Sequence, residues 1–157
     1  MQITIDEELI MLGLDGQQNV DILSRMADNL CEHGYVKDSY KSAVIARERV
    51  FATGLPTCSY GVAIPHTDIV HVNKPTICMA RFKQDVDFVI MGEESEKVSV
   101  RLAFMLAMNE QHAQLSVLQK LMGILQDNEA LTYLATEEDK NKIKAFIIDK
   151  LNLAGGK

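Results

Sequence analysis

The sequence predicts an α/β fold in which one mixed β-sheet lies between helices. Two observations carry this prediction. Short apolar segments rich in β-branched residues alternate along the chain with stretches whose apolar residues recur at helical spacing. In addition, residues 98–108 are apolar on both strand faces beyond Arg101, as expected for a central strand covered on both sides. The 157 residues contain no repeat or linker, which predicts a single domain over residues 1–153 and a tail at 154–157.

The first elements are a strand and a helix. Residues 9–12 form a short apolar run that ends at Gly13, and its length favours a strand over a helix. Apolar side chains in residues 20–31 then fall on one face of a helix. The pair His33-Gly34 is typical of a helix C-terminus.

A second helix and two strands follow. The helix begins near Asp38, a favourable N-cap, and should pair antiparallel with the first. Residues 61–64 form a short strand stopped by Pro65, and the alternating residues 76–82 form another. The positions of the second helix expected to face inward are Tyr40, Ala43, Val44 and Val50.

The C-terminal part predicts a central strand and two helices. Within residues 98–108, even-numbered positions share one strand face and odd-numbered positions the other. Asn109 is expected to cap a helix, and residues 136–139 resemble a capping box that opens the last helix. The expected buried positions are Leu115, Leu118, Met122 and Leu125 in the first of these helices, and Ile143, Phe146, Ile147 and Leu151 in the second.

Charge and composition exclude several classes of function. The 16 Lys and Arg residues against 22 Asp and Glu give a net charge of −6, so we expect no nucleic-acid partner. No apolar segment reaches the roughly 20 residues that cross a bilayer, and the N-terminus lacks a secretory signal. We therefore expect a cytoplasmic protein without membrane insertion, whose Cys31, Cys58 and Cys78 are reduced thiols.

Four histidines are candidates for chemistry near neutral pH. His66 follows Pro65 at the carboxyl end of a strand, where ligands gather in α/β sheets, although an inert turn histidine is the commoner case for this spacing. His112 lies in the first turn of a helix, where free N–H groups favour an anion; simple packing is its alternative. His33 fits a helix C-cap, and His71 a solvated surface position.

A possible phosphate-binding segment precedes His66. Arg47 and Arg49 carry guanidinium groups suited to bidentate phosphate contacts, and Thr53-Gly54 supplies a hydroxyl and a permissive backbone. The plain alternative is that both arginines occupy the solvated end of a helix, where basic residues match the dipole.

Four motifs in order make a family resemblance specific. The sequence resembles the enzyme IIA domain of the fructose/mannitol family of the bacterial phosphotransferase system through Arg47-Glu48, Thr53-Gly54, residues 61–66 (GVAIPH) and His112. The resemblance extends over nearly the whole chain and implies the mannitol/fructose-type fold. Residues 54–60 and 65–68 look like the galactitol-type branch.

The resemblance implies a phosphocarrier that needs no cofactor and no metal. His66 would accept a phosphoryl group from the carrier protein HPr and pass it to a cysteine of enzyme IIB, which phosphorylates sugar entering through the membrane component, enzyme IIC. Arg47 would stabilise the phosphate, and His112 would be the second active-site histidine. The remaining implied site residues are Glu48, expected to orient Arg47; Thr53 and Gly54, expected to shape the pocket wall; and Arg49, the other candidate for the phosphate contact.

Other functions remain open at this point. A nitrogen-type regulatory enzyme IIA shares the fold and the histidine but signals by its phosphorylation state. A hydrolase could use Cys58 with His66, or a metal enzyme could use His66, Asp68 and His71. The sugar is also open, with galactitol, another polyol, a pentose derivative or ascorbate as candidates.

Overall fold

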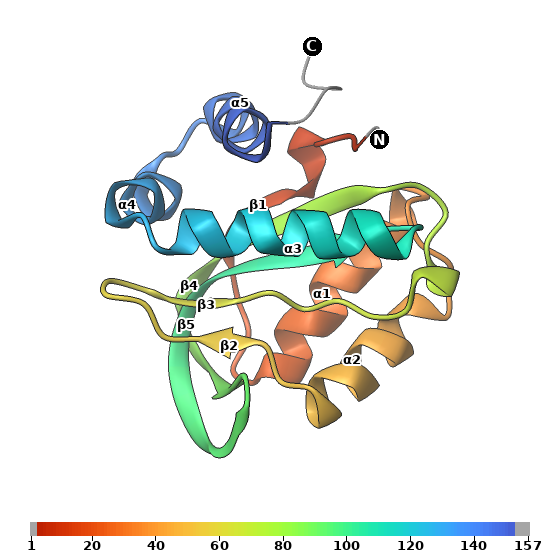
Figure 1. Ribbon diagram of the computed structural model, residues 1–157, viewed down its shortest axis with the longest axis horizontal. Helices are drawn as coiled ribbons and strands as arrows, with labels where there is room; N and C mark the ends of the chain where they lie inside the picture. The colour runs from red at the N-terminus through yellow and green to blue at the C-terminus, as the bar shows by residue number, and fades with distance from the viewer. Residues whose placement is uncertain (1–2, 153–157) are drawn as a thin grey trace.

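A mixed sheet of five strands forms the centre of the protein, as the computed structural model of residues 3–152 shows (Figure 1). The strands are β1 (Ile10–Leu14), β2 (Gly54–Leu55), β3 (Gly61–Ala63), β4 (Thr76–Ile90) and β5 (Glu93–Ala107). The helices are α1 (Asn19–Glu32), α2 (Tyr40–Val50), α3 (Gln111–Leu125), α4 (Asn128–Thr136) and α5 (Lys140–Leu151), with short 3-10 turns η1 (Glu7–Leu9) and η2 (Ile69–His71). The predicted fold class is confirmed.

The sheet is built on the long antiparallel pair β4 and β5. Strand β1 runs parallel to β4, and β3 runs parallel to β5. Strand β2 is antiparallel to β3 and touches the far end of β4, where Gly54 pairs with Ile90. This contact requires glycine, because a Cβ at residue 54 would lie 2.6 Å from the carbonyl oxygen of Val89.

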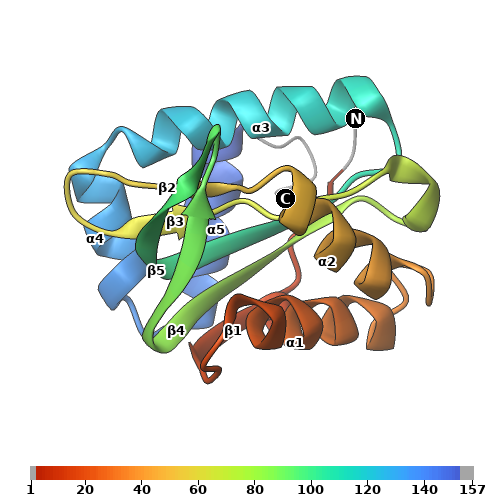
Figure 2. The ribbon, with the colours of Figure 1, turned by 90° about the horizontal axis from the view of Figure 1, so that it is seen from below.

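Helices cover both faces of the sheet, and each face has its own apolar core. Figure 2 shows α1 and α3 on opposite sides of the strands. Along β5, Leu102 and Phe104 belong to the core beneath α3, α4 and α5, whereas Ala103 and Met105 belong to the core beneath α1 and α2. The alternation predicted for this part of the strand is therefore confirmed, as is the double burial of a central strand.

The alternation fails on the N-terminal side of Arg101. Val100 was expected on the face of Leu102, but it packs in the opposite core. The cause is a bulge at Arg101, because consecutive residues of β3, Gly61 and Val62, pair with Val100 and Leu102 and leave Arg101 as an extra residue. The pairing with β4 is irregular at the same point, where residues 82–85 lie opposite Arg101. Both strands also extend beyond the predicted limits. Residues 83–85 of β4 and 93–97 of β5 are exposed and lack the apolar signal of a buried strand, although Val86 and Phe88 of β4 are buried.

Two predicted features of α2 were wrong. The helix begins at Tyr40 after Ser39, and Asp38 instead accepts a hydrogen bond from the Cys31 thiol. At the other end, Val50 is 65% exposed because the buried stripe of α2 runs through Tyr40, Val44 and Glu48. The neighbouring prediction holds, since α1 and α2 pack together and run in roughly opposite directions (Figure 2).

The C-terminal helices differ from the prediction in their limits. Helix α3 follows Glu110 rather than Asn109, and Leu115 is 53% exposed because the buried stripe runs through Ala113, Val117 and Leu121. Helix α4 was not predicted at all.

The expected capping box at residues 136–139 was also wrong. Thr136 ends α4, and Asp139 caps α5 by accepting from the Asn141 N–H. The predicted tail at 154–157 lies outside the described residues, as does residue 153. Within residues 3–152, no helix has the length and apolarity needed to cross a membrane.

Candidate active site

His66 is held at the end of a strand that the sheet fixes in place. Strand β3 ends at Ala63, after which Ile64 and Pro65 remain buried. The Pro65 carbonyl accepts a hydrogen bond from the Leu106 N–H of β5 at 2.9 Å. The backbone directly before His66 is therefore pinned to the central strand, while the imidazole itself is half-buried.

The hydrogen bond of the His66 ring assigns its protonation. The Nδ1 atom lies 2.9 Å from the carbonyl oxygen of Ile64. A carbonyl oxygen can only accept, so Nδ1 carries the proton and the lone pair of the neutral ring is on Nε2. Burial lowers the pKa of His66, and the charge of Arg47 lowers it further, against the opposing effect of the Ile64 carbonyl. These effects favour the neutral ring, with an unprotonated Nε2.

Arg47 and Arg49 occupy the last turn of α2 but face different surroundings. Arg47 stacks over the Phe51 ring at 4.6 Å and acts electrostatically on His66. Arg49 lines a separate cavity of about 1010 Å³ between the end of α2 and the β4–β5 hairpin, beside Met91 and Glu94. The structure therefore brings Arg47, rather than Arg49, within electrostatic range of His66.

Glu48 does not orient Arg47, contrary to the sequence-based expectation. Its side chain points inward and is only 5% exposed. One carboxylate oxygen accepts from the Thr53 backbone N–H at 2.8 Å, and the other accepts from the Thr53 hydroxyl at 2.9 Å. Burial raises the pKa of Glu48 to about 7, although the bonds from Thr53 act to lower it. The cause of the difference is helix geometry, because adjacent residues on a helix project in different directions.

Thr53 directly precedes β2, and Gly54 is the first residue of that strand. Both are buried. The Thr53 hydroxyl also accepts from the Ile64 N–H at 3.2 Å, two residues before His66 in the chain. Gly54 serves the close approach of β2 to β4 that is described above.

His112 is the second residue of α3 and is exposed in its first turn, as the sequence predicted. The same end of the helix approaches the segment after His66, where Gln114 Nε2 donates to the Thr67 carbonyl at 3.4 Å. Figure 1 shows this segment running alongside α3. The structure thus brings His112 to the His66 end of the molecule.

Two residues near the site were missed by the sequence analysis. The Tyr40 hydroxyl donates to the Leu106 carbonyl at 2.6 Å, so α2 supports the same residue of β5 that holds Pro65. Gln114 has a buried side-chain oxygen, Oε1, without a hydrogen-bond partner in residues 3–152. Tyr40 was predicted only as an inward-facing core residue, because nothing in the sequence reveals a partner 66 residues away.

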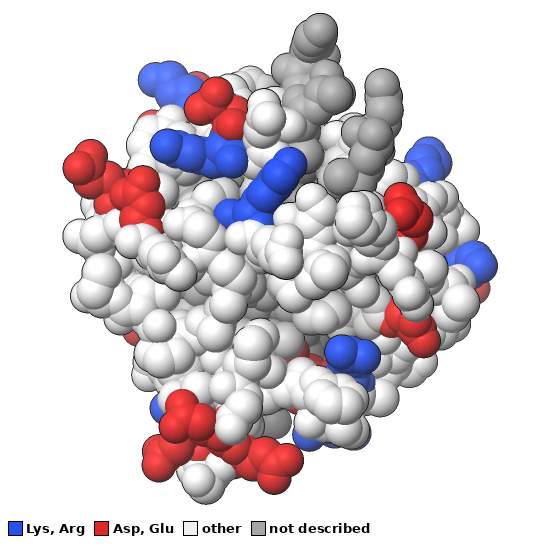
Figure 3. Space-filling view, viewed as in Figure 1, with Lys and Arg blue, Asp and Glu red and all other residues white. Residues whose placement is uncertain are grey.

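The face of the molecule that is drawn in Figure 3 carries few charges in its middle. In Figure 3, acidic side chains gather over the tip of the β4–β5 hairpin, where Glu93, Glu94 and Glu96 are exposed, while the band over β3 and α3 is largely uncharged. The exposed large apolar side chains include Val50, Phe51, Val70 and Leu115. Three of these belong to the segments that surround the site, the end of α2 and the first turns of α3.

The other histidines have local partners. His33 caps α1, as expected, through Nδ1 against the Asn29 carbonyl at 2.9 Å. His71 is half-buried and paired with the Ser39 hydroxyl at 2.8 Å, rather than simply solvated. Among the described residues, no group of three or more His, Cys, Asp or Glu side chains is arranged to hold a metal.

The hydrolase alternative lacks the required geometry. Cys58 contacts the Asn128 side chain at the start of α4 (3.7 Å), just beyond the C-terminal end of α3. His66 lies at the opposite end of α3, which spans roughly 22 Å at 1.5 Å per residue. Cys58 and His66 are therefore not a nucleophile and base pair in this structure.

Comparison with known proteins agrees with this arrangement. Residues 3–150 match the family model described as "Phosphoenolpyruvate-dependent sugar phosphotransferase system, EIIA 2". The galactitol-specific EIIA component of Escherichia coli K12 is 28% identical over 124 residues, which are 79% of this chain and 82% of that protein.

Solved structures show the same fold. Mannitol enzyme IIA of Escherichia coli, in complex with phosphorylated enzyme IIB, matches with a TM-score of 0.73 at 22% identity, covering 96% of this chain and 98% of that one. The nitrogen regulatory protein IIA-Ntr of Neisseria meningitidis matches with the same TM-score of 0.73 at 22% identity, covering 91% and 95%. The chain belongs to the EIIA 2 family of the sugar phosphotransferase system and is a phosphotransferase component of that system.

Proposed function

We propose that the protein accepts a phosphoryl group on Nε2 of His66 from HPr and passes it to a cysteine of enzyme IIB. The observation that carries this proposal is the neutral imidazole, whose Nδ1–H is engaged by the Ile64 carbonyl. The Nε2 lone pair forms the new P–N bond, and the breaking P–N bond returns its electron pair to the nitrogen of the donor phosphohistidine. This step needs neither a general base nor a metal ion.

The surrounding cations support the transfer. Phosphoryl transfer places negative charge on three equatorial oxygens, so positioning and electrostatic stabilisation carry most of the catalysis. Arg47 is in electrostatic range of His66, and the first turn of α3 contributes unpaired N–H groups and the His112 side chain. We assign Arg47 to the phosphate oxygens and His112 to a hydrogen bond with the same group.

The partners follow from the family. The mannitol enzyme IIA relative forms a complex with phosphorylated enzyme IIB, which supports enzyme IIB as the acceptor for this chain. HPr would be the donor and enzyme IIC the indirect membrane partner, which assigns the carrier to the cytoplasm. The 28% identity to the galactitol-specific component makes galactitol or a related polyol the proposed substrate of the complete system.

A regulatory role is the second candidate, because IIA-Ntr shares the fold at the same TM-score. The two roles differ in the fate of the phosphoryl group. Incubating the phosphorylated chain with a galactitol-type enzyme IIB should move the label to a cysteine of that protein. If the label stays on the chain while HPr returns it efficiently, the regulatory role is favoured.

Phosphorylation itself is tested with phosphoenolpyruvate, enzyme I and HPr. We expect intact-mass spectrometry to show one acid-labile phosphoryl group on the wild-type chain and none on His66→Ala. His33→Ala is the matched control and should be labelled normally, because His33 caps α1 far along the chain from this site. An unlabelled wild-type chain, or a His66→Ala chain that keeps the adduct, would overturn the proposal.

A further inference from the structure

A line of three hydrogen bonds leads from His66, by way of the Ile64 backbone and the Thr53 hydroxyl, to the buried carboxylate of Glu48. His66 Nδ1 donates to the Ile64 carbonyl at 2.9 Å, and the Ile64 N–H donates to the Thr53 hydroxyl oxygen at 3.2 Å. The Thr53 hydroxyl in turn donates to Glu48 at 2.9 Å. Glu48, Thr53 and Ile64 are at most 5% exposed, so water does not compete for these bonds.

The Thr53 hydroxyl joins two of these bonds, because it accepts from the Ile64 N–H and donates to Glu48, and bonds that share a hydroxyl in this way strengthen each other. The N–H and the carbonyl of Ile64 belong to two different peptide groups separated by the Cα atom, so Ile64 transmits position and not polarisation. Glu48 and Thr53 therefore fix the piece of backbone whose carbonyl oxygen accepts from His66 Nδ1.

The ionised form of Glu48 is the form that completes the line. The Thr53 hydroxyl has one proton, and because its oxygen accepts from Ile64, that proton is free to bond Glu48. A protonated Glu48 that donated to the same oxygen would leave the Thr53 proton without an acceptor. The Thr53 backbone N–H, 2.8 Å from the other oxygen, likewise requires an acceptor there.

We propose that Glu48 and Thr53 are positioning residues: they fix the Ile64 backbone, whose carbonyl keeps the His66 proton on Nδ1 and leaves the Nε2 lone pair free to attack. The proposal rests on the phosphocarrier function proposed above. As in a catalytic triad, an acceptor at the nitrogen that does not attack fixes the tautomer of the histidine. Here that acceptor is the Ile64 carbonyl, and Glu48 and Thr53 hold the backbone that carries it; this arrangement is called the relay below.

The surroundings of Glu48 make its charge state responsive to pH. Arg47 and Arg49 flank it in sequence, but both are exposed, and Glu48 forms no ion pair with a residue in the described part of the chain. Thr53 is its hydrogen-bond partner on the side of the sheet. Because burial raises its pKa to about 7, the relay should weaken as the pH falls through neutrality.

The first experiment measures the rate of His66 phosphorylation by HPr for a set of variants. Thr53→Val removes the hydroxyl at nearly constant shape and should slow the reaction by about tenfold or more, whereas Thr53→Ser keeps the hydroxyl and should restore most of the rate. Thr136→Val is the control, because the hydroxyl that it removes bonds only the Thr132 carbonyl in α4. Thermal unfolding of each variant separates a lost fold from a lost relay.

The second experiment follows the pH profile of that rate. The wild-type chain should lose rate as the pH falls below about 7, the pKa of Glu48. In Glu48→Gln the rate should be lower throughout and its remaining decline should move below pH 6.5, toward the lowered pKa of His66. A folded Glu48→Gln chain with the wild-type profile would contradict the relay.

A third measurement needs no variant and no phosphoryl donor. The ¹⁵N resonance of His66 Nδ1 in the wild-type chain should move with a midpoint near pH 7 as Glu48 titrates, in addition to its own titration at lower pH. A Nδ1 resonance that follows a single titration, together with an unchanged rate in folded Thr53→Val, overturns the relay. The phosphocarrier function would survive that outcome, because it depends on the label at His66 and not on these variants.

Discussion

His33 and His66 make the same first hydrogen bond and yet have opposite properties. In both residues Nδ1 lies 2.9 Å from a backbone carbonyl oxygen, that of Asn29 for His33 and that of Ile64 for His66. The pKa of His33 is raised, first by this carbonyl and then by its bond to Glu8, whereas burial and Arg47 lower the pKa of His66. The surroundings of the ring, rather than the shared Nδ1 bond, distinguish the helix cap His33 from the proposed nucleophile His66.

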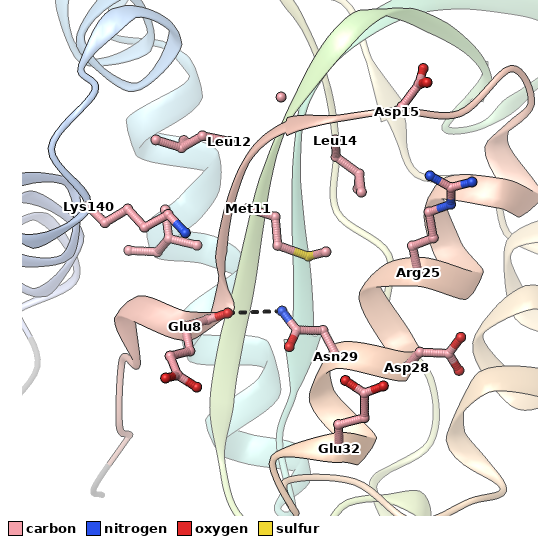
Figure 4. A pocket seen from close by; sticks show the side chains of 12 residues that line it. Glu8, Met11, Leu12, Leu14, Asp15, Arg25, Asp28, Asn29, Glu32 and Lys140 are labelled. Atoms are coloured by element: carbon pink, nitrogen blue, oxygen red, sulfur yellow. Dashed lines mark hydrogen bonds between the residues drawn. The ribbon is translucent and has the colours of Figure 1, made fainter.

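The two regions also differ in the charge that surrounds them. Glu8, the partner of His33, lines a cavity of about 630 Å³ beside β1 and α1, shown in Figure 4. Asp28 and Glu32 line this cavity together with the basic residues Arg25 and Lys140, so its lining carries both signs of charge. His66 instead lies near Arg47 and the first turn of α3. The Glu8 carboxylate favours a protonated imidazole at His33, whereas the charge of Arg47 disfavours one at His66.

The largest effect that would sharpen this contrast is expected from Arg47→Ala. Loss of a preset cation should slow phosphoryl transfer by roughly 100- to 1000-fold, and it should raise the pKa of His66 because a repulsive charge is removed. Arg49→Ala is the matched control and should change the rate by less than about threefold, since an exposed charge outside the site is screened by water and salt. Timed phosphoryl-transfer assays measure the rate, and NMR titration of the imidazole measures the pKa of His66. Equal losses in the two variants would mean that the arginines are assigned wrongly.

The titration of Glu48 should lower the free energy of unfolding as the pH rises. Its pKa in the folded state, about 7, lies above the ordinary value of 4.5, so the folded chain binds more protons between these pH values than the unfolded chain. The free energy of unfolding should therefore fall by up to about 3 kcal/mol between pH 4.5 and 7 from this group alone. Urea unfolding at several pH values should show a shallower decline in Glu48→Gln. Parallel curves for the two chains would remove Glu48 from the stability balance.

His112→Ala tests the hydrogen bond that we assign to His112 and the phosphoryl group. The residue is exposed, so the variant should fold with an unchanged melting temperature. Transfer should slow by roughly 10- to 100-fold, the value of one hydrogen bond to a charged group. Gln111→Ala, which alters the adjacent exposed position of α3, is the control. An unaltered rate in His112→Ala would reduce this histidine to a surface residue.

The smallest effect concerns the cap at His33. Its raised pKa means that its contribution to stability is fully present below the ordinary value of 6.5 and is lost as the pH rises through the folded-state pKa. Glu8→Gln should therefore lower the melting temperature slightly at pH 6 and hardly at pH 9, without slowing phosphoryl transfer. Glu7→Gln, an exposed neighbour, is the comparison variant. The same loss at both pH values would indicate that Glu8 acts through something other than the charge on His33.

Local signals predicted much of the fold. The apolar stripe of α1, the cap at His33-Gly34 and the alternation from Leu102 to Ala107 each depend on residues close together in the chain, and each is confirmed. The predictions were wrong where the structure depends on contacts between segments that are distant in the chain. The extended hairpin arms of β4 and β5, the irregularity at Arg101 and the orientation of α3 are set by contacts with distant segments.

For the site, too, some features follow from the sequence and others only from the tertiary structure. The sequence alone determined the family resemblance and the order of Arg47, His66 and His112, because residue identity and spacing are properties of the chain. The tertiary structure alone decided that Arg47 rather than Arg49 acts on His66, and that Glu48 turns inward to Thr53. The physical reason is that hydrogen bonds, burial and Coulomb interactions depend on distance in space. Folding places Thr53 and Ile64, 11 residues apart in the chain, in direct contact.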